Sequence, residues 1–213
     1  MKPKLVCFDF DDTLTTENSW YSLNTAMGIY PEEDYAMYVE YKNGDVNYAD
    51  WTKKIENLYR ERGLASRERI TQVLKQFNLR PDAHSTITEL QNRGYEIIII
   101  SGSFDITISH AAHLLNIKTY KAGTNIVFDD EDNFSHFENQ GEESSTKLKQ
   151  LTEICNSKNM QLSKCVCIGD GANDLEIFKA TGNGICFTNG SDEVKAAAKF
   201  QIESLANLLQ ILT

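Results

Sequence analysis

Near its N-terminus the chain carries an apolar run, Leu5-Val6-Cys7-Phe8, that leads directly into Asp9-Phe10-Asp11-Asp12-Thr13-Leu14-Thr15. A short continuous apolar run is typical of a buried strand, and the polar residues after it are typical of the turn that ends one. Side chains at i and i+2 of a strand point the same way, so Asp9 and Asp11 are expected on one face.

This segment places three carboxylates within four residues, which is costly at the end of a buried strand. Mutual repulsion and burial raise the pKa values of such groups unless a cation compensates. Two interpretations follow. Asp9 and Asp11 either hold a divalent cation and supply a nucleophile, or they belong to a solvated Asp-rich turn.

Short apolar runs alternate with helical patterns along most of the chain. Strands are predicted at Lys4–Phe10, Tyr95–Ser101, Lys164–Gly169 and Gly184–Phe187. Helices are predicted between and after them, at Pro81–Gly94, Phe104–Asn116, Ser144–Lys158, Ala172–Ala180 and Glu203–Leu212. This alternation implies right-handed crossovers, and therefore an α/β fold with a doubly wound parallel sheet.

The stretch from Thr15 to about Arg80 interrupts this alternation, because it is too long for one crossover and lacks a central strand. Helices are expected there, for example at Tyr48–Arg62 and Ser66–Asn78. We interpret residues 15–80 as a small helical cap domain inserted after the first strand, and residues 1–14 and 81–213 as the core. Seven of the nine tyrosines and both tryptophans fall within this cap.

Composition narrows the function classes. The chain has 213 residues, a formal net charge of −10 and a pI of about 4.9, so binding to nucleic acid or to an anionic membrane is not expected. No apolar stretch approaches the ~20 residues that span a bilayer. The Asp cluster begins too early to leave room for a signal-peptide core, and the expected location is cytoplasmic.

Several residues of types that bind metals are better explained without a metal. Cys165 and Cys167 lack a second pair at zinc-site spacing, and the odd number of cysteines in mostly apolar runs favours reduced, buried thiols. His110 and His113 are assigned to a solvated helix face. The acidic run 129–133 is the expected tip of a hairpin between Ile126 and Phe137, because it lacks the ligand spacing of a calcium loop.

Two segments have the character of an anion site. Ser101-Gly102-Ser103 closes a predicted strand just before a helix, where a hydroxyl and backbone N–H groups can hold an anion. The alternative is that Ser103 merely caps that helix. Lys147 lies at the start of another predicted helix, and Lys149 is an equally placed rival.

A further polar segment, Gly169-Asp170-Gly171-Ala172-Asn173-Asp174, follows the third predicted core strand. Its two carboxylates and one amide lie at a strand end, as Asp9 does. Because ligands of open α/β sheets bind at the carboxyl ends of the strands, these segments are expected to converge on one site.

These motifs, in this order, resemble those of the haloacid dehalogenase-like hydrolases. The similarity is greatest to the phosphoserine-phosphatase-like branch, which has a helical cap after the first strand. The resemblance implies a Rossmann-like core and a phosphoric monoester hydrolase that uses Mg²⁺ and acts on a small phosphorylated metabolite.

The resemblance also implies residue roles. Asp9 would attack phosphorus and form an aspartyl-phosphate, while Asp11 would act as general acid and then as general base. Mg²⁺ would bind the Asp9 carboxylate, the Asp11 carbonyl and Asp170, with Asp174 supporting them from behind. The residues that would hold the phosphate or face the leaving group are Ser101, Gly102, Lys147 and Asn173.

The predicted substrate is less well defined by the motifs. Phosphoserine is the leading candidate, but Asn18 stands, with Glu17 beside it, where that branch has a substrate-binding glutamate. Ser103 replaces a glycine. Arg60 and Arg62 are the substitutes for a cap arginine that the branch uses, unless they only cover a solvated helix face.

The aromatic cap suggests a second class of substrate. Rings at Trp20, Tyr21, Tyr48, Trp51 and Tyr59 would suit a cationic head group such as that of phosphoethanolamine or phosphocholine, unless they form the core of the cap. A phosphoryl-transferring or non-catalytic relative on the same fold is a further alternative. A dinucleotide-binding domain is disfavoured, because no G-x-G-x-x-G run occurs.

Overall fold

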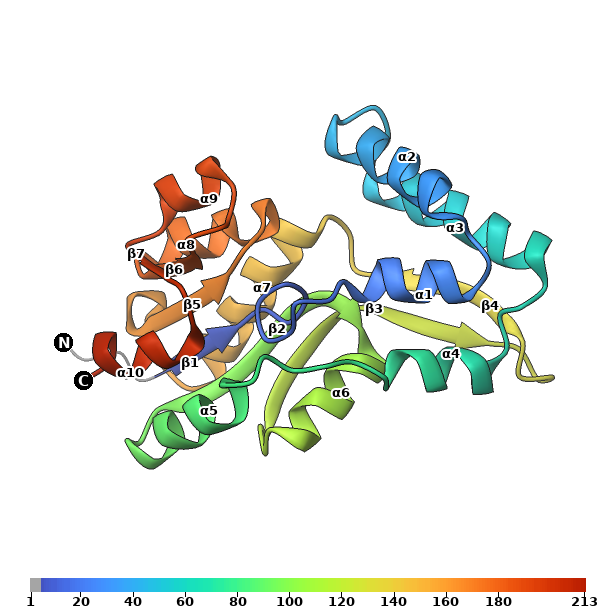
Figure 1. Cartoon of the computed structure of the whole chain (residues 1–213). Helices are drawn as coiled ribbons and strands as arrows, with labels where there is room; N and C mark the ends of the chain where they lie inside the picture. The colour runs from blue at the N-terminus through green and yellow to red at the C-terminus, as the bar shows by residue number, and fades with distance from the viewer. Residues whose placement is uncertain (1–4) are drawn as a thin grey trace.

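The computed structural model describes residues 5–213, so the predicted start of the first strand at Lys4 lies outside the described residues. Its core is a seven-stranded sheet with the order β4-β3-β2-β1-β5-β6-β7, parallel except for β4, which runs antiparallel to β3 (Figure 1). The strands are β1 (Leu5–Phe8), β2 (Glu96–Phe104), β3 (Thr119–Phe128), β4 (Phe134–Asn139), β5 (Cys165–Gly169), β6 (Gly184–Phe187) and β7 (Phe200–Ile202).

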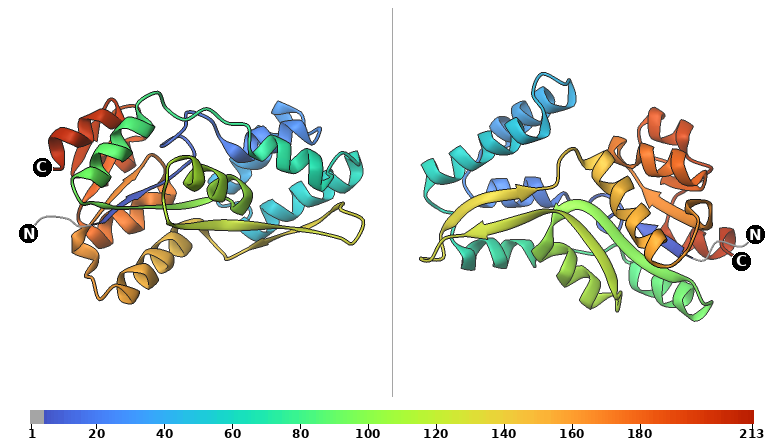
Figure 2. Two further views of the ribbon diagram at one scale, coloured as in Figure 1. Left: turned by 90° about the horizontal axis from the view of Figure 1, so that it is seen from below. Right: turned by 180° about the vertical axis from the view of Figure 1, so that it is seen from behind.

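Helices cover both faces of this sheet, as a doubly wound fold requires. Alternate residues of β1 face opposite sides. Val6 and Phe8 pack in one cluster with α5 (Ala83–Asn92), α6 (Asp105–Leu114) and α10 (Leu208–Ile211). Leu5 and Cys7 pack in another with α7 (Glu143–Ser157), α8 (Leu175–Thr181) and α9 (Asp192–Ala197) (Figure 2). The predicted fold class is confirmed.

Some element boundaries differ from the predicted ones for local reasons. β2 continues past Ser101 to Phe104, because β3 keeps pairing with it across a register shift. The helix expected from Ala172 starts with a 3₁₀ turn, η2 (Ala172–Asp174), and α8 follows it. The C-terminal helix is likewise divided into η3 (Leu205–Asn207) and α10, while one further 3₁₀ turn, η1 (Leu162–Lys164), precedes β5.

The segment after β1 forms a helical cap, composed of α1 (Ser19–Ala26), α2 (Pro31–Lys42), α3 (Tyr48–Arg62) and α4 (Arg67–Leu74). Its apolar cluster extends onto the β3–β4 hairpin: the Trp20 ring centroid lies 5.1 Å from that of Phe137, and Glu56 Oε1 accepts the Phe137 N–H at 2.9 Å. The cap therefore rests on the hairpin, which extends beyond the rest of the sheet.

Two expectations from composition have structural counterparts. All five cysteines are buried free thiols, and four of them lie in β1, β5 and β6. Burial raises the pKa of the Cys155 and Cys186 thiols, which keeps them in the neutral form. Among residues 5–213, no helix combines the length and the apolar character needed to cross a membrane.

Candidate active site

Asp9 lies at the carboxyl end of β1 and points into a group of buried charges. Its backbone N–H donates to the Ile168 carbonyl at 2.9 Å, which continues the β1–β5 ladder and orients the residue. Its side chain is only 5% exposed, and Oδ1 accepts the Phe10 N–H at 2.7 Å. The other oxygen, Oδ2, lies 2.7 Å from the Lys147 ammonium.

Lys147 extends from α7 and joins two carboxylates. Its Nζ lies 2.7 Å from Asp9 Oδ2 and 2.7 Å from Asp174 Oδ1, and the residue is 1% exposed. Burial alone would lower the pKa of this ammonium, but the two carboxylates outweigh that effect and hold the pKa above its usual value. Lys149, the rival candidate, is exposed. Helical periodicity explains the difference, because side chains two residues apart point to different faces.

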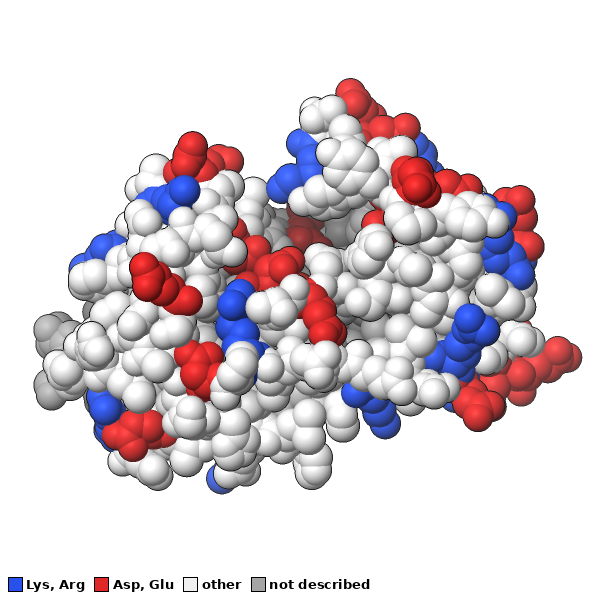
Figure 3. All heavy atoms as spheres, in the orientation of Figure 1, with Lys and Arg blue, Asp and Glu red and all other residues white. Residues whose placement is uncertain are grey.

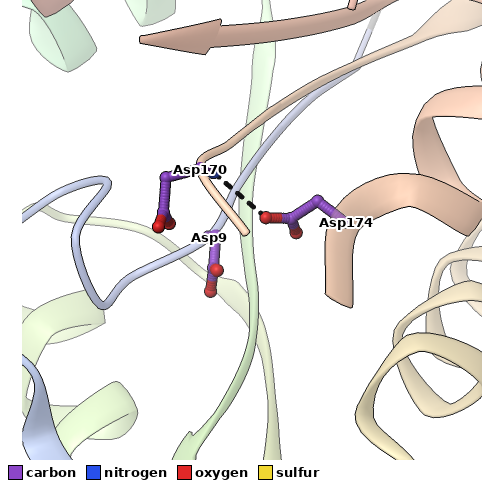
Figure 4. A group of neighbouring side chains, drawn as sticks. All are labelled: Asp9, Asp170 and Asp174. Atoms are coloured by element: carbon purple, nitrogen blue, oxygen red, sulfur yellow. Dashed lines mark hydrogen bonds between the residues drawn. The ribbon is translucent and has the colours of Figure 1, made fainter. Parts of the chain in front are cut away.

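Asp9, Asp170 and Asp174 form an acidic cluster in which each residue offers an oxygen within 4.8 Å of the others (Figure 4). Asp174 Oδ2 accepts the backbone N–H groups of Asp170 at 3.1 Å and Gly171 at 3.2 Å, and Lys147 takes its other oxygen. The turn after β5 is thus built around the Asp174 carboxylate.

Burial and mutual repulsion raise the pKa of Asp170 to about 8 and, chiefly through burial, that of Asp174 to about 6. One ammonium does not neutralise three carboxylates, so the cluster has excess negative charge. Hard carboxylate oxygens at this separation suit a hard divalent cation, and the donor set fits Mg²⁺.

Asp11 points away from this cluster toward the first turn of α1. Its oxygens accept the Ser19 N–H at 3.0 Å and the Ser19 hydroxyl at 2.6 Å. Burial raises the pKa of Asp11 to about 8, although the Ser19 hydrogen bonds lower it in part. An acid that is protonated near neutral pH is suited to donate a proton to a leaving group. The sequence interpretation missed Ser19.

These raised pKa values predict how stability depends on pH. Asp11 and Asp170 bind protons more tightly in the folded chain than in the unfolded chain, where the pKa of Asp is about 3.9. Their stabilising contribution is fully present below that value and is lost as pH rises through about 8. We therefore expect the melting temperature in chelator to fall over this range, and added Mg²⁺ to stabilise most at its upper end.

Asp170→Asn is the matched variant for this prediction, because it removes one of the groups whose pKa is raised to about 8. Its melting temperature should depend less steeply on pH and should respond less to Mg²⁺. An identical pH slope in the variant and the wild type would contradict the assignment of the raised pKa to Asp170.

The third carboxylate of the opening segment, Asp12, shapes the turn. It has a left-handed backbone conformation with φ +54°, which Asp tolerates better than most residues do, and its side chain is exposed. Arg80 donates to the Asp12 and Thr13 carbonyls at 2.8 Å each, while the Thr13 hydroxyl donates to Asp170 Oδ1 at 3.1 Å.

The other predicted phosphate-binding residues gather beside Asp9. Ser101 and Gly102 lie at the end of β2, and the Ser101 Oγ accepts the Ser103 N–H at 3.3 Å. Ser103 does not cap the following helix, since Phe104 is the N-cap of α6; its hydroxyl lies 2.6 Å from that of Ser19. Asn173 donates through Nδ2 to Glu143 at 2.9 Å.

A cavity of about 660 Å³ lies between these strand ends and the cap. Figure 3 shows the corresponding hollow, with acidic side chains inside it. The core side of its wall includes Asp9, Asp11, Ser101, Gly102, Asp170 and Asn173. The structure therefore brings these predicted site residues together at one cavity, while Lys147 and Asp174 support it from beneath.

The cap side of the wall differs from the predicted aromatic cage. Tyr48 and Tyr59 are buried in the cap cluster, where their hydroxyls lie 3.2 Å from Thr124 Oγ1 and 2.7 Å from Asn24 Oδ1 respectively. Trp20 and Trp51 are also mostly buried, although both reach the cavity. The exposed rings at the cavity are Tyr21, Tyr35 and Tyr38, of which the sequence interpretation named only Tyr21.

The residues considered as substitutes for substrate-binding groups are engaged elsewhere. Arg60 donates to the Ser135 carbonyl at 2.6 Å, and Arg62 donates to both oxygens of Glu33. Glu17 accepts the Asn78 side-chain amide at 2.7 Å. Asn18 does reach the cavity, but its Oδ1 accepts the Tyr21 N–H as the N-cap of α1. Among residues 5–213, Lys42 is the only cap cation that lines the cavity.

A doubly wound core with converging carboxylates at its strand ends, a buried lysine and a helical cap is typical of a hydrolase of α/β type, and the acidic cluster could hold a metal ion. The family model for haloacid dehalogenase-like hydrolases matches residues 3–182, and the chain belongs to this family. The predicted family and enzyme class are thereby confirmed.

Within the family, the chain is similar to phosphoserine phosphatases. It is 28% identical to the phosphoserine phosphatase of Methanocaldococcus jannaschii over 87% of this chain and 86% of that protein. Two solved structures, a phospho-aspartyl intermediate analogue of phosphoserine phosphatase and a substrate-bound phosphoserine phosphatase complex, each superpose with a TM-score of 0.83. Coverage is 100% of both chains, at 28% and 27% identity.

Proposed function

We propose that this protein is a Mg²⁺-dependent phosphomonoester hydrolase that acts through an aspartyl-phosphate intermediate on a small phosphorylated metabolite. The observation that carries this proposal is the buried Asp9–Lys147–Asp174 arrangement, with 2.7 Å between the ammonium and each carboxylate and Asp170 close by. Similarity to a structure of a phospho-aspartyl intermediate analogue supports it.

In the first half-reaction, an Asp9 carboxylate oxygen attacks phosphorus and the phosphorus–ester oxygen bond breaks. Asp11, protonated because its pKa is raised to about 8, donates its proton to the departing alkoxide. In the second half-reaction, Asp11 takes a proton from a water molecule that attacks phosphorus. Inorganic phosphate leaves, and the Asp9 carboxylate is regenerated.

The remaining residues neutralise the charge of the transferred group. Ser101, the Gly102 N–H, Lys147 and Asn173 are proposed to hold the phosphoryl oxygens or to face the leaving group. The carboxylates of Asp9 and Asp170 and the Asp11 carbonyl would hold Mg²⁺, with Asp174 behind them. When bound, Mg²⁺ supplies positive charge for the phosphoryl oxygens.

Phosphoserine is the leading candidate substrate because the similar proteins are phosphoserine phosphatases. Its carboxylate needs a cationic partner on the cap side, and Lys42 on α2 is the group available at the cavity. We therefore expect Lys42→Met to raise the KM for phosphoserine about tenfold while leaving kcat nearly unchanged, because the contact is made equally in the ground and transition states.

A phosphomonoester with an amine but no carboxylate is the second candidate, and the charge of the cavity favours it. Asp12, Asp34 and Glu142 line the wall, together with the exposed rings of Tyr35 and Tyr38. Acidic groups and aromatic faces both attract a cation, as phosphoethanolamine and phosphocholine would present.

Comparing kcat/KM for phosphoserine, phosphoethanolamine and phosphocholine, with Mg²⁺ and with chelator, tests both candidates. Turnover is expected only with the metal. A much higher kcat/KM for phosphoserine rejects the substrates with a cationic head group. A higher kcat/KM for phosphoethanolamine or phosphocholine rejects phosphoserine. Equal turnover in chelator would contradict the proposed metal dependence.

A further inference from the structure

Glu143 is an acidic residue at the cavity to which neither the sequence motifs nor the proposed mechanism gives a role. It is the first residue of α7, one helical turn before Lys147, so the two side chains lie on the same face of the helix. Residues four apart in this arrangement point to the same region. Glu143 is thereby directed toward the groups proposed to hold phosphate.

Its carboxylate accepts a hydrogen bond from one of those residues and lies against the backbone of another. Oε2 accepts the Asn173 Nδ2–H at 2.9 Å. Oε1 lies against the backbone of Gly102, where a Cβ would come within 2.5 Å of it. Glu143 is also close enough to Lys147 and Asp9 to be attracted by the first and repelled by the second, and burial raises its pKa.

These partners are the ones an anionic phosphoryl group would use. A carboxylate and a phosphoryl group both present acceptor oxygens with negative charge, and both are stabilised by amide donors and a nearby ammonium. The Asn173 amide and the space beside Gly102 therefore cannot serve Glu143 and a phosphoryl group at the same time, and Lys147 attracts either anion.

The neighbouring residue ties the start of α7 to the cap. Glu142 Oε1 accepts the Tyr48 N–H at 3.0 Å, at the N-terminus of α3, and its Oε2 accepts the Tyr41 hydroxyl at 3.3 Å. Gly141 precedes them with φ +106°, a conformation that glycine adopts without strain. Two adjacent glutamates thus contact the two sides of the cavity, one on the cap and one on the core.

We propose that Glu143 is an internal competitor for the phosphoryl site: its carboxylate holds the Asn173 amide and fills the space beside Gly102, and a phosphate or phosphomonoester must displace it to bind. This inference rests on the proposed function, because it uses the phosphate-binding role of those residues. In this proposal Glu143 sets the affinity of the site for the phosphoryl group, whatever the leaving group is.

The expected size of the effect follows from the competing equilibrium. A ligand that binds only the displaced state has its affinity reduced by the fraction of protein in that state. A buried hydrogen bond to a charged group stabilises the state that contains it. Its free energy corresponds to about a ten- to hundredfold ratio between the populations of the bonded and the displaced states. Removing the carboxylate should therefore tighten phosphate binding by at least about tenfold.

Calorimetric titration of inorganic phosphate into the Mg²⁺-loaded protein tests this directly, with wild type, Glu143→Ala and Glu143→Gln compared. Glu143→Ala should bind phosphate at least about tenfold more tightly than wild type, and the isosteric Glu143→Gln should also bind more tightly. Glu153→Gln is the matched control: it removes the same charge from an exposed position of the same helix and should bind as wild type does.

Steady-state kinetics supply a second readout. The KM values for phosphoserine and phosphoethanolamine should fall by the same factor in Glu143→Ala, because the competition concerns the group they share. Unchanged or weaker phosphate binding in an active Glu143→Ala variant would overturn the inference and leave the proposed function standing. Failure of wild type and variants alike to bind phosphate or turn over substrate would overturn both.

Discussion

Asp9→Asn is expected to reduce phosphomonoester turnover by at least about 10⁴-fold, as replacement of a covalent nucleophile does in other enzymes. An amide oxygen is a poor nucleophile, and the amide cannot carry the negative charge that Lys147 neutralises. The substitution preserves shape, and the new side-chain oxygen can still accept the Phe10 N–H that Asp9 Oδ1 accepts at 2.7 Å. The variant should therefore fold.

The measurement is turnover of the best substrate with Mg²⁺, together with circular dichroism and thermal unfolding to establish that the variant is folded. Rapid acid quench with substrate labelled in the phosphoryl group should leave label on the wild-type protein and none on Asp9→Asn. The lifetime of that label also separates a hydrolase from a phosphoryl-transferring relative. Near-normal turnover by a folded Asp9→Asn variant would refute the nucleophile assignment.

Asp12→Asn is the informative comparison, because Asp12 belongs to the same acidic segment but has an exposed side chain. Asn tolerates the left-handed conformation that Asp12 adopts at φ +54°. We expect Asp12→Asn to retain most of its turnover. Equal losses in the two variants would mean that the segment acts through its total charge rather than through one nucleophile.

Lys147→Met is expected to destabilise the protein by about 3–5 kcal/mol and to abolish turnover, because it leaves buried carboxylates without their cation. Lys147 is 1% exposed and pairs with Asp9 and Asp174 at 2.7 Å each. Methionine keeps most of the length of the lysine side chain but removes its charge, so the lost stability reports on electrostatics more than on packing. Urea unfolding measures the change in free energy.

The chain contains its own control for this variant. Lys149 lies on the same helix two residues later and is exposed, so Lys149→Met should stay within about 0.5 kcal/mol of wild type. Adding Asp174→Asn to Lys147→Met should recover part of the lost stability, since it removes one of the uncompensated charges. If Lys147→Met and Lys149→Met have the same free energy of unfolding, the buried ion pairs do not hold the site together.

Much of the fold follows from local sequence patterns. Continuous apolar runs such as Leu5–Phe8 and Gly184–Phe187 identify parallel strands, because such strands are covered on both faces and need no polar alternation. The strand ends then identify Asp9, Ser101 and Asp170 as neighbours, since the carboxyl ends of parallel strands meet at one edge. Composition alone also separates the aromatic cap from the core.

Other features depend on contacts that no local pattern encodes. The hairpin tip at 129–133 is predicted from sequence, but β3 begins at Thr119, well before Ile126, and the packing of the hairpin against the cap depends on partners such as Trp20. The local sequence does not distinguish buried from exposed rings among the five cap aromatic residues proposed to bind a cationic head group, yet most of them form the core of the cap. Tyr35 and Tyr38, on the more exposed helix α2, face the cavity instead.

The sequence by itself therefore determined the four central strands of the sheet, the position of the cap and the converging carboxylates, because these depend on short-range periodicity and on which residues end each strand. Only the tertiary structure decided that Lys147 rather than Lys149 joins Asp9 to Asp174, that Ser19 binds Asp11, and that Glu143 lies on Gly102. The physical reason is distance along the chain: hydrogen bonds and ion pairs between residues far apart in sequence exist only once packing has brought their helices and strands together.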